Sequence, residues 1–257
     1  MPEMAIETNL MEEMTWPEVR DAIREGRTVL ITVGSTEQHG PHLPLNTDCV
    51  LPVAIALEAA KQVPLVVAPP IRFGAMSRAL SGGGETFPGT LSVRGTTLIT
   101  TLHEVTSALA RHGFRKIVIQ NWHYENAGYL WEAADLTVTK HPDTRILILE
   151  SPMPEFSEDE LAQIFPKGFP GWDVEHASIM ETSMMYVIRP ELVRRDKIAD
   201  DQALRHPTWD VVPAPDEFIP KSGVLWHPTE SSDEIGRRLV DAAVTRLVEA
   251  IRTEFGD

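Results

Sequence analysis

Thr28-Val-Leu-Ile-Thr-Val33 is an unbroken run of β-branched and apolar residues near the start of the chain. A run of this kind, without alternating polar residues, is typical of a strand that is buried on both faces. Similar short runs follow at 65–67, 116–120 and 145–149. We therefore expect four buried strands.

Helical patterns lie between these runs and after the last of them. Pro52 falls near the first turn of one pattern, where a missing N–H costs little, and Gly113 follows another as a C-terminal cap. The predicted helices span 52–63, 96–111, 126–140 and about 232–254. Strands that alternate with such helices predict parallel βαβ units, and therefore an α/β fold with a mostly parallel sheet.

The length of 257 residues suits one large α/β domain or two small ones. Two irregular stretches, 72–94 and 200–229, interrupt the pattern, but neither separates two cores, so we predict one domain over 1–257. No stretch approaches the roughly 18 consecutive apolar residues of a membrane span. The acidic stretch 1–13 lacks the basic and then apolar order of a signal peptide, and we expect a cytoplasmic protein.

The chain carries a net charge of −15, from 23 basic and 38 acidic residues. So acidic a surface repels phosphate backbones and anionic lipids, which argues against nucleic acid and membranes as partners. Cys49 is the only cysteine, which excludes an intrachain disulfide and a cysteine zinc site. We expect Cys49 to be a small buried apolar residue.

Two mirrored steps of an acid and a histidine carry the chemistry. Glu37 and His39 are two residues apart, as are His123 and Glu125, and residues at this spacing in extended backbone project to the same side. Each step follows a predicted strand, at the edge where parallel sheets place ligands. With Asp48 they form five ligands for two ions, so Asp48, the unpaired member, is the candidate bridge. Carboxylates mixed with imidazole suit Zn, Mn or Fe.

The alternative is structural. A single acid–histidine step is common and usually carries no function, the histidines can be hydrogen-bonded core residues, and the acids can face solvent. Two steps at equivalent places after two predicted strands favour the metal site.

Further candidates lie downstream of the second step. Trp172 follows Pro170 and Gly171, which fits a mobile aromatic lid, although a tryptophan covering the core is the plainer interpretation. His176 opens a helical pattern and can pass a proton near neutral pH, or else make a structural hydrogen bond. Glu175 and Glu181 are either its orienting partners or solvated acids.

The triple glycine 82–84 lacks the Gly-Lys-Ser/Thr of a nucleotide loop, so a flexible loop near the site is expected instead. Ser77 and Tyr124 are possible substrate contacts. His42 is expected to be structural or to support the ligands, and His112 to be a cation at a helix C-terminus. The methionines 180, 184 and 185 are expected in a helix core.

Five motifs resemble those of the creatininase family (creatinine amidohydrolases), in the same order and across about 15–255. They are GSTEQHGPHLPLNTD at 34–48, SGGGETFPGT at 81–90, NWHYEN at 121–126, GWDVEH at 171–176 and ETS at 181–183. The resemblance implies a three-layer α/β/α sandwich, a binuclear site with Zn and Mn, and a homohexamer.

Carried over by position, the resemblance implies that Glu37 and His123 hold one metal, that His39 and Glu125 hold the other, and that Asp48 bridges them. It also implies a lid role for Trp172. The residues expected in catalysis are then His176, Glu125 and Trp172, and those expected at the substrate are Ser77, Trp122, Tyr124, Trp172, Asp173 and Glu175.

The expected reaction is opening of a small polar cyclic amide, creatinine to creatine, by a hydroxide that bridges the two metals. Trp122 replaces the glycine usual in the second motif of creatininases, and 150–154 lacks their second pocket tryptophan. Two alternatives therefore stay open. One is hydrolysis of another small ring, such as carbon–carbon cleavage of a diketo-inositol, as by a 3-dehydro-scyllo-inosose hydrolase. The other is a non-catalytic, metal-dependent binding or assembly subunit.

Overall fold

A computed structural model describes residues 8–151 and 153–256, so part of the acidic stretch 1–13 lies outside it. In the described chain the sheet consists of β1 (Thr28–Val33), β2 (Leu65–Val67), β3 (Lys116–Asn121) and β4 (Arg145–Leu149). The order is β2-β1-β3-β4, and all neighbours are parallel. The four predicted strands are confirmed, with β3 one residue longer than expected.

Helices connect and cover the strands. They are α1 (Trp16–Arg24), α2 (Thr47–Ala59), α3 (Ala79–Gly82), α4 (Gly95–His112), α5 (Ala127–Lys140), α6 (Glu158–Ile164), α7 (Ile179–Ile188) and α8 (Asp233–Phe255). Short 3-10 helices lie at Met11–Glu13, Tyr124–Asn126, Pro190–Leu192, Arg195–Lys197, Asp216–Phe218 and Pro228–Glu230.

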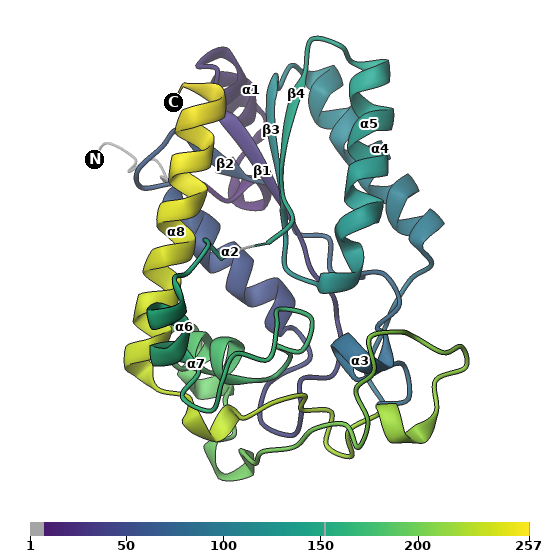
Figure 1. The fold of residues 1–257 in the computed structure, drawn as a ribbon. Helices are drawn as coiled ribbons and strands as arrows, with labels where there is room; N and C mark the ends of the chain where they lie inside the picture. Colours follow the sequence, from purple (N-terminus) through teal and green to yellow (C-terminus); the bar gives the residue numbers. More distant parts are fainter. Residues whose placement is uncertain (1–7, 152, 257) are drawn as a thin grey trace.

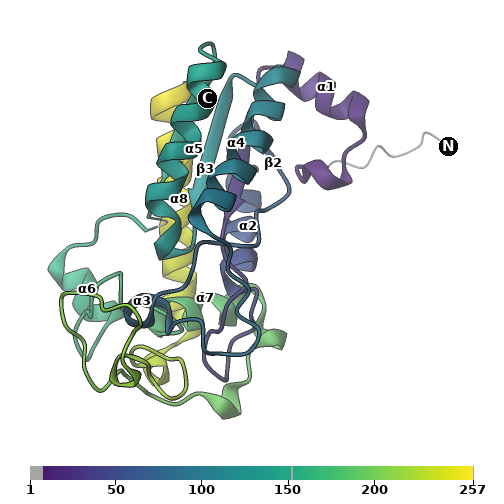
Figure 2. The same ribbon diagram turned by 90° about the vertical axis from the view of Figure 1, so that its right-hand side faces the viewer.

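The sheet is the middle of three layers, as predicted. Leu30 and Val118 pack into a core with α2, α7 and α8, whereas Ile31 and Ile119 pack with α1, α4 and α5 on the other face. Figures 1 and 2 show these two helical layers on opposite sides of the strands. Because side chains alternate across a strand, a run buried on both faces needs apolar residues at every position.

Two predicted helix starts are wrong. The helix expected from Pro52 begins at Thr47, because Pro52 is accommodated inside α2. The pattern expected to open at His176 begins as a helix only at Ile179, so His176 lies in the turn before α7. Both corrections place functional residues at helix starts. The predicted cap is confirmed at Gly113, whose φ of 119° suits a glycine after α4.

The sequence patterns did not predict α1 and α6, although both begin with a capping box, Thr15 with Glu18 and Ser157 with Glu160. The two irregular stretches, 72–94 and 200–229, lie beyond the carboxyl ends of the strands, in the lower half of Figure 1. They therefore surround the edge of the sheet at which the acid–histidine steps emerge.

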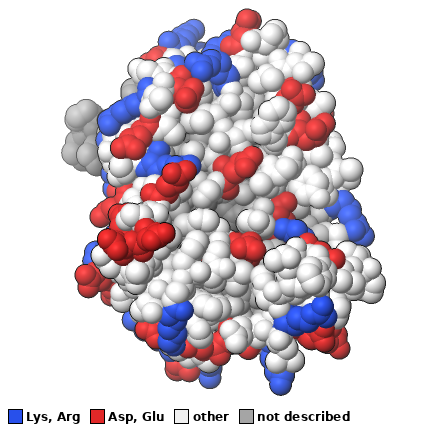
Figure 3. Space-filling model, viewed as in Figure 1, with Lys and Arg blue, Asp and Glu red and all other residues white. Residues whose placement is uncertain are grey.

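The surface agrees with the composition. Acidic side chains are spread over the face shown in Figure 3, with basic ones interspersed among them. Within the described residues, no helix combines the length and apolarity required to cross a membrane.

Candidate metal centre

The carboxyl ends of β1 and β3 deliver most of the polar side chains of the site. Glu37 and His39 follow β1, His123 follows β3, and Asp48 lies in the first turn of α2. All four side chains are almost completely buried. Buried charges of this kind require partners, so their convergence marks a functional site rather than a solvated cluster.

Gly34 and Pro52 explain how Asp48 reaches this place. Pro52 lacks the N–H that would otherwise bond to the carbonyl of Asp48 inside α2. A Cβ at Gly34 would lie 2.2 Å from that carbonyl oxygen, so only glycine lets the segment after β1 pass this closely.

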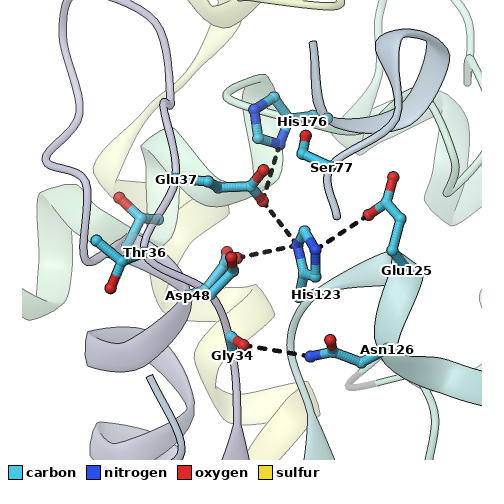
Figure 4. A network of polar contacts seen from close by, with 12 residues as sticks. Gly34, Thr36, Glu37, Asp48, Ser77, His123, Glu125, Asn126 and His176 are labelled. Atoms are coloured by element: carbon cyan, nitrogen blue, oxygen red, sulfur yellow. Dashed lines mark hydrogen bonds and ion pairs between the residues drawn. The ribbon is translucent and has the colours of Figure 1, made fainter. Parts of the chain in front are cut away.

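The first group of ligand atoms joins the two steps. Nδ1 of His123 lies 2.7 Å from Oε1 of Glu37 and 3.5 Å from Oδ2 of Asp48 (Figure 4). The other ring nitrogen, Nε2, lies 3.0 Å from the carbonyl oxygen of Ala75 and donates to it. That hydrogen bond fixes the ring so that Nδ1 faces the carboxylates, which is how ligand histidines are oriented.

The second group is built in the same way. Nε2 of His39 lies 3.1 Å from Oδ1 of Asp48 and 3.5 Å from Oε1 of Glu181, while its Nδ1 donates to the carbonyl of Glu37 at 3.2 Å. Asp48 therefore presents one oxygen to each histidine. Either group offers three ligand atoms within 4.8 Å of one another, as a metal ion requires.

Unpartnered oxygens show that the site fits a cation. Within residues 8–151 and 153–256, Oε2 of Glu37 and Oδ2 of Asp48 are buried without a hydrogen-bond partner. Such acceptors cost free energy unless a cation or donor satisfies them. Carboxylates with imidazole nitrogens are a donor set for Zn or Mn.

Electrostatics point the same way. Burial lowers the pKa of both imidazoles, but the carboxylates outweigh it: Glu181 and Asp48 hold the pKa of His39 well above its usual value, and Glu37 and Glu125 do so for His123. Burial raises the pKa of Asp48, but the two histidines outweigh it and hold that pKa below its usual value. The carboxylates thus favour positive charge on the two imidazoles, in the space that metal cations would occupy.

Glu125 does not join either group among the described residues. Its Oε2 lies 3.4 Å from Nε2 of His123, the ring edge turned away from Asp48 (Figure 4). Its Oε1 accepts hydrogen bonds from the Ser81 hydroxyl at 2.5 Å and the backbone N–H of Arg78 at 3.1 Å. The structure therefore brings Glu181, not Glu125, to His39.

Glu181 is a functional candidate that the sequence patterns did not single out as a ligand. It lies in the first turn of α7, and its Oε2 accepts the backbone N–H of Ala177 at 2.7 Å. Ala177 has a φ of 52°, a conformation that non-glycine residues rarely adopt and that clusters at functional sites. One acid inside the otherwise uncharged and mostly buried helix IMETSMMYVI is the signal that could have found it.

His176 lies above the two groups. Its ring centroid is 4.4 Å from that of His39, and its Nδ1 is 3.9 Å from Oε1 of Glu37 (Figure 4). The third cluster of ligand-type side chains consists of Glu37, His39 and His176. A proton carrier placed here reaches the same space as the ligand atoms.

A cavity of about 980 Å³ opens onto the site. Trp122, Tyr124, Trp172 and Glu175, which are among the residues predicted at the substrate, line it. Asp173 instead lines an adjoining cavity of about 280 Å³, which shares Tyr124 with the first. Ser77 lines neither cavity, and its hydroxyl is buried without a hydrogen-bond partner.

Trp172, Glu175 and His42 each have a defined environment in the structure. Trp172 packs edge-on against Phe169 at 4.8 Å between ring centroids, in a group of aromatic rings with Phe165. Burial raises the pKa of the Glu175 carboxyl well above its usual value. Nε2 of His42 lies 2.8 Å from the hydroxyl of Thr182, so His42 has a structural contact.

Cys49 is buried, as predicted, and burial raises the pKa of its thiol to about 12, which keeps the thiol protonated. The methionines at 180, 184 and 185 are buried in the core around α7, as predicted.

An α/β sandwich with buried carboxylates and imidazoles at the carboxyl ends of its strands defines a metal-dependent hydrolase. A family model for creatininase (creatinine amidohydrolase) matches residues 12–251. The chain is 36% identical to creatinine amidohydrolase of Pseudomonas putida over 95% of this chain and 96% of that one. It belongs to the creatininase family.

Other comparisons extend this. The mycofactocin precursor peptide peptidase of Mycolicibacterium smegmatis is 30% identical over 87% of this chain and 84% of its own. The 3-dehydro-scyllo-inosose hydrolase of Thermotoga maritima is 26% identical over 84% and 65%. A tryptophan-to-phenylalanine mutant of creatininase superposes with a TM-score of 0.93 at 33% identity, covering 98% of this chain and all of that one. Solved creatininases include a Zn–Zn form and a manganese form.

Proposed function

We propose that this hydrolase uses two divalent ions, Zn, Mn or one of each, to open a small polar cyclic amide, with creatinine as the first candidate. The observation that carries the proposal is the position of Asp48, whose two oxygens face different histidines. A carboxylate with this geometry suits two ions held side by side better than one. Creatinine is supported by the 36% identity to the Pseudomonas putida enzyme.

The ligand sets follow from the distances. We assign Glu37, Asp48 and His123 to one ion and His39, Asp48 and Glu181 to the other. The sequence-based pairing of His39 with Glu125 is replaced in this proposal, because Glu125 faces the opposite ring edge of His123. Glu125 is then free to handle protons beside the site.

The reaction adds water to the amide carbonyl carbon, breaks the carbon–nitrogen bond and moves a proton to the departing nitrogen. When bound, the ions would supply an acidified water and polarisation of the carbonyl. Glu125, held by Ser81 and Arg78, is placed to accept the proton of the water. His176 is placed to take up a proton at Nδ1, the nitrogen nearest Glu37, and to pass it to the departing nitrogen, so that the proton removed from the water is the one finally delivered.

Trp172 and Trp122 shape the space for the ring. Trp172 lines the cavity near His176 and can cover a bound planar ring, which excludes water from the reaction. Trp122 is buried to 6% exposure and fills space where creatininases carry a glycine. The indole of Trp122 therefore limits the size and shape of the substrate ring that can bind beside the metal ligands.

A second candidate is hydrolysis of a different small substrate by the same groups. The cavity of about 980 Å³ exceeds what a single small ring fills, and Trp122 changes its wall. Relatives named for a peptide and for an inosose show that the family fold hosts other hydrolases.

One experiment tests the function. The protein is stripped with a chelator and reloaded with Zn or Mn, and turnover is measured on creatinine, a hydantoin, a short peptide and a keto-inositol. We expect turnover of at least one substrate, lost on stripping and restored by reloading. Full activity in the stripped protein would refute the metal mechanism, and a bound but unturned ligand would favour the binding-subunit alternative.

A further inference from the structure

Gln38 lies between the ligand residues Glu37 and His39 in the sequence, and its side chain makes a separate set of hydrogen bonds. Its side chain is almost completely buried. Oε1 accepts the backbone N–H of Gly40 at 2.8 Å, and Nε2 donates to the carbonyls of Gly82 and Gly223, both at 2.9 Å. Because carbonyls only accept and an N–H only donates, these three contacts fix the orientation of the amide.

The glycines leave room for this amide. A Cβ at Gly83 would lie 2.6 Å from Nε2 of Gln38, and one at Gly223 would lie 1.8 Å from its Oε1. Both glycines have positive φ, 74° and 86°, which other residues rarely adopt. Within the triple glycine at 82–84, Gly83 is thereby explained, and the carbonyl of Gly82 accepts from the same amide.

The amide ties together three segments that are far apart in sequence. Gly82 lies in the irregular stretch 72–94 and Gly223 in the irregular stretch 200–229, while Gln38 itself follows β1. Each hydrogen bond is buried, so breaking it would leave an unsatisfied carbonyl. The segment that carries Glu37 and His39 is thus held against both loops through one side chain.

His176 is held by the same residue. Its Nε2 lies 2.9 Å from the backbone carbonyl oxygen of Gln38, and since that oxygen can only accept, a hydrogen bond here requires the proton on Nε2. The side-chain Nε2 of Gln38 is also 2.9 Å from this ring nitrogen, but both of its protons are directed to Gly82 and Gly223. The contact leaves Nδ1 of His176 as the nitrogen that faces Glu37.

We propose that Gln38 is a positioning residue that acts through His176. The hydrogen bonds of its side-chain amide keep its backbone carbonyl against Nε2 of His176, and this contact sets the tautomer and the direction of the ring. The inference rests on the proposed proton-carrying role of His176. His39 and His123 are likewise pinned by a backbone carbonyl at one nitrogen. Among these three carbonyls, the one that holds His176 belongs to Gln38, the residue whose own side-chain amide is fixed by buried hydrogen bonds.

A double-mutant cycle tests the inference in the metal-loaded protein. Gln38→Met keeps the length of the side chain but removes all its hydrogen bonds, and His176→Ala removes the ring. We expect Gln38→Met to lower kcat by about 10- to 100-fold, as loss of an orienting contact does, with bound metal unchanged. In the His176→Ala background the same change should cost less than about twofold. Equal losses in both backgrounds would overturn the inference.

Two further variants guard the interpretation. Gln38→Glu keeps the acceptor for Gly40 but loses both donations, so it should show the same coupling to His176 even if Gln38→Met fails to fold. Gln62→Met changes an exposed glutamine after α2 and should leave kcat unchanged. A Gln38→Glu loss that is also full in the His176→Ala background would count against the proposal.

An activity-independent measurement separates this inference from the function. In metal-free protein with ¹⁵N-labelled histidine, the signal absent from His176→Ala identifies His176. We expect it to report the Nε2–H tautomer in the wild type and a mixture in Gln38→Met. An Nδ1–H tautomer in the wild type, or no change in Gln38→Met, would overturn the role of Gln38. Loss of turnover on the whole substrate panel, with the expected tautomers, would refute only the proposed function.

Discussion

Asp48 Oδ1 lies 3.1 Å from His39 Nε2, and this contact joins the start of α2 to the segment after β1. The second oxygen of Asp48 faces His123 instead. We therefore expect Asp48→Asn to weaken both metal positions together, because one amide cannot act as two anionic ligands. Activity should fall by more than about 100-fold, and bound metal per chain should drop at both positions.

The control for this change is Asp135→Asn, on the exposed face of α5. It should bind metal and turn over substrate as the wild type does. Retention of the full metal content by Asp48→Asn would contradict a shared ligand.

Substitutions of Glu181 and Glu125 should have different effects, because Glu181 lies beside His39 and Glu125 does not. Glu181→Gln should lose one ion, whereas Glu125→Gln should keep both and lose kcat by about 100-fold or more, as expected for a general base. Metal analysis alongside kinetics separates the two. If Glu125→Gln loses an ion and Glu181→Gln does not, the pairing of His39 with Glu125 expected from the family resemblance is correct after all.

The strands and the mirrored steps could be predicted because each depends on a local pattern. The run at 28–33 consists only of β-branched and aliphatic residues, and Glu37 with His39 needs only extended backbone to face one way. Glu181 depends on how α7 packs against α2, which spacing along the chain does not encode. The start of α2 was predicted wrongly because a proline inside a helix is disfavoured. Here α2 accommodates Pro52, and the Asp48 carbonyl that it leaves without an N–H partner lies close to Gly34.

Stability of the metal-free protein should depend on pH in a defined direction. His39 and His123 have folded-state pKa values above their unfolded ones, so their stabilisation is fully present below the unfolded pKa of about 6.5 and is lost as pH rises through the folded pKa. The chelated protein should therefore melt several degrees lower at pH 9 than at pH 6.

Metal weakens this trend, because it replaces the protons on the two imidazoles. Loaded protein should lose less of its melting temperature between pH 6 and pH 9, and metal should bind more tightly at the higher pH. Thermal melts of stripped and loaded samples across this range provide the check. A stripped protein that gains stability towards pH 9 would show that the histidines are not protonated in the folded state.

Trp172 should act on substrate and not on metal, since it contacts the cavity and an aromatic group that includes Phe169. Trp172→Ala should raise KM and lower kcat, so that kcat/KM falls by about 10-fold or more. Trp172→Phe keeps an aromatic ring over the cavity, so its kcat/KM should fall less. Metal content should be the same in both. An unchanged kcat/KM in Trp172→Ala would show that the tryptophan only covers the core.

Trp122 provides the sharpest test of substrate shape. It is buried at the cavity wall, immediately before the second acid–histidine step, at the position where the resemblance to the creatininase motif leads us to expect glycine. If the added ring restricts the space beside Glu37 and His123, Trp122→Gly should raise kcat/KM for creatinine relative to every other substrate in the panel. The change also removes a buried aromatic side chain, at a cost of about 3–5 kcal/mol, so Trp122→Phe is the matched variant with a smaller loss. It should shift the preference in the same direction by less. A wild type that already prefers creatinine, with Trp122→Gly lowering that preference, would mean that the indole is part of the creatinine pocket.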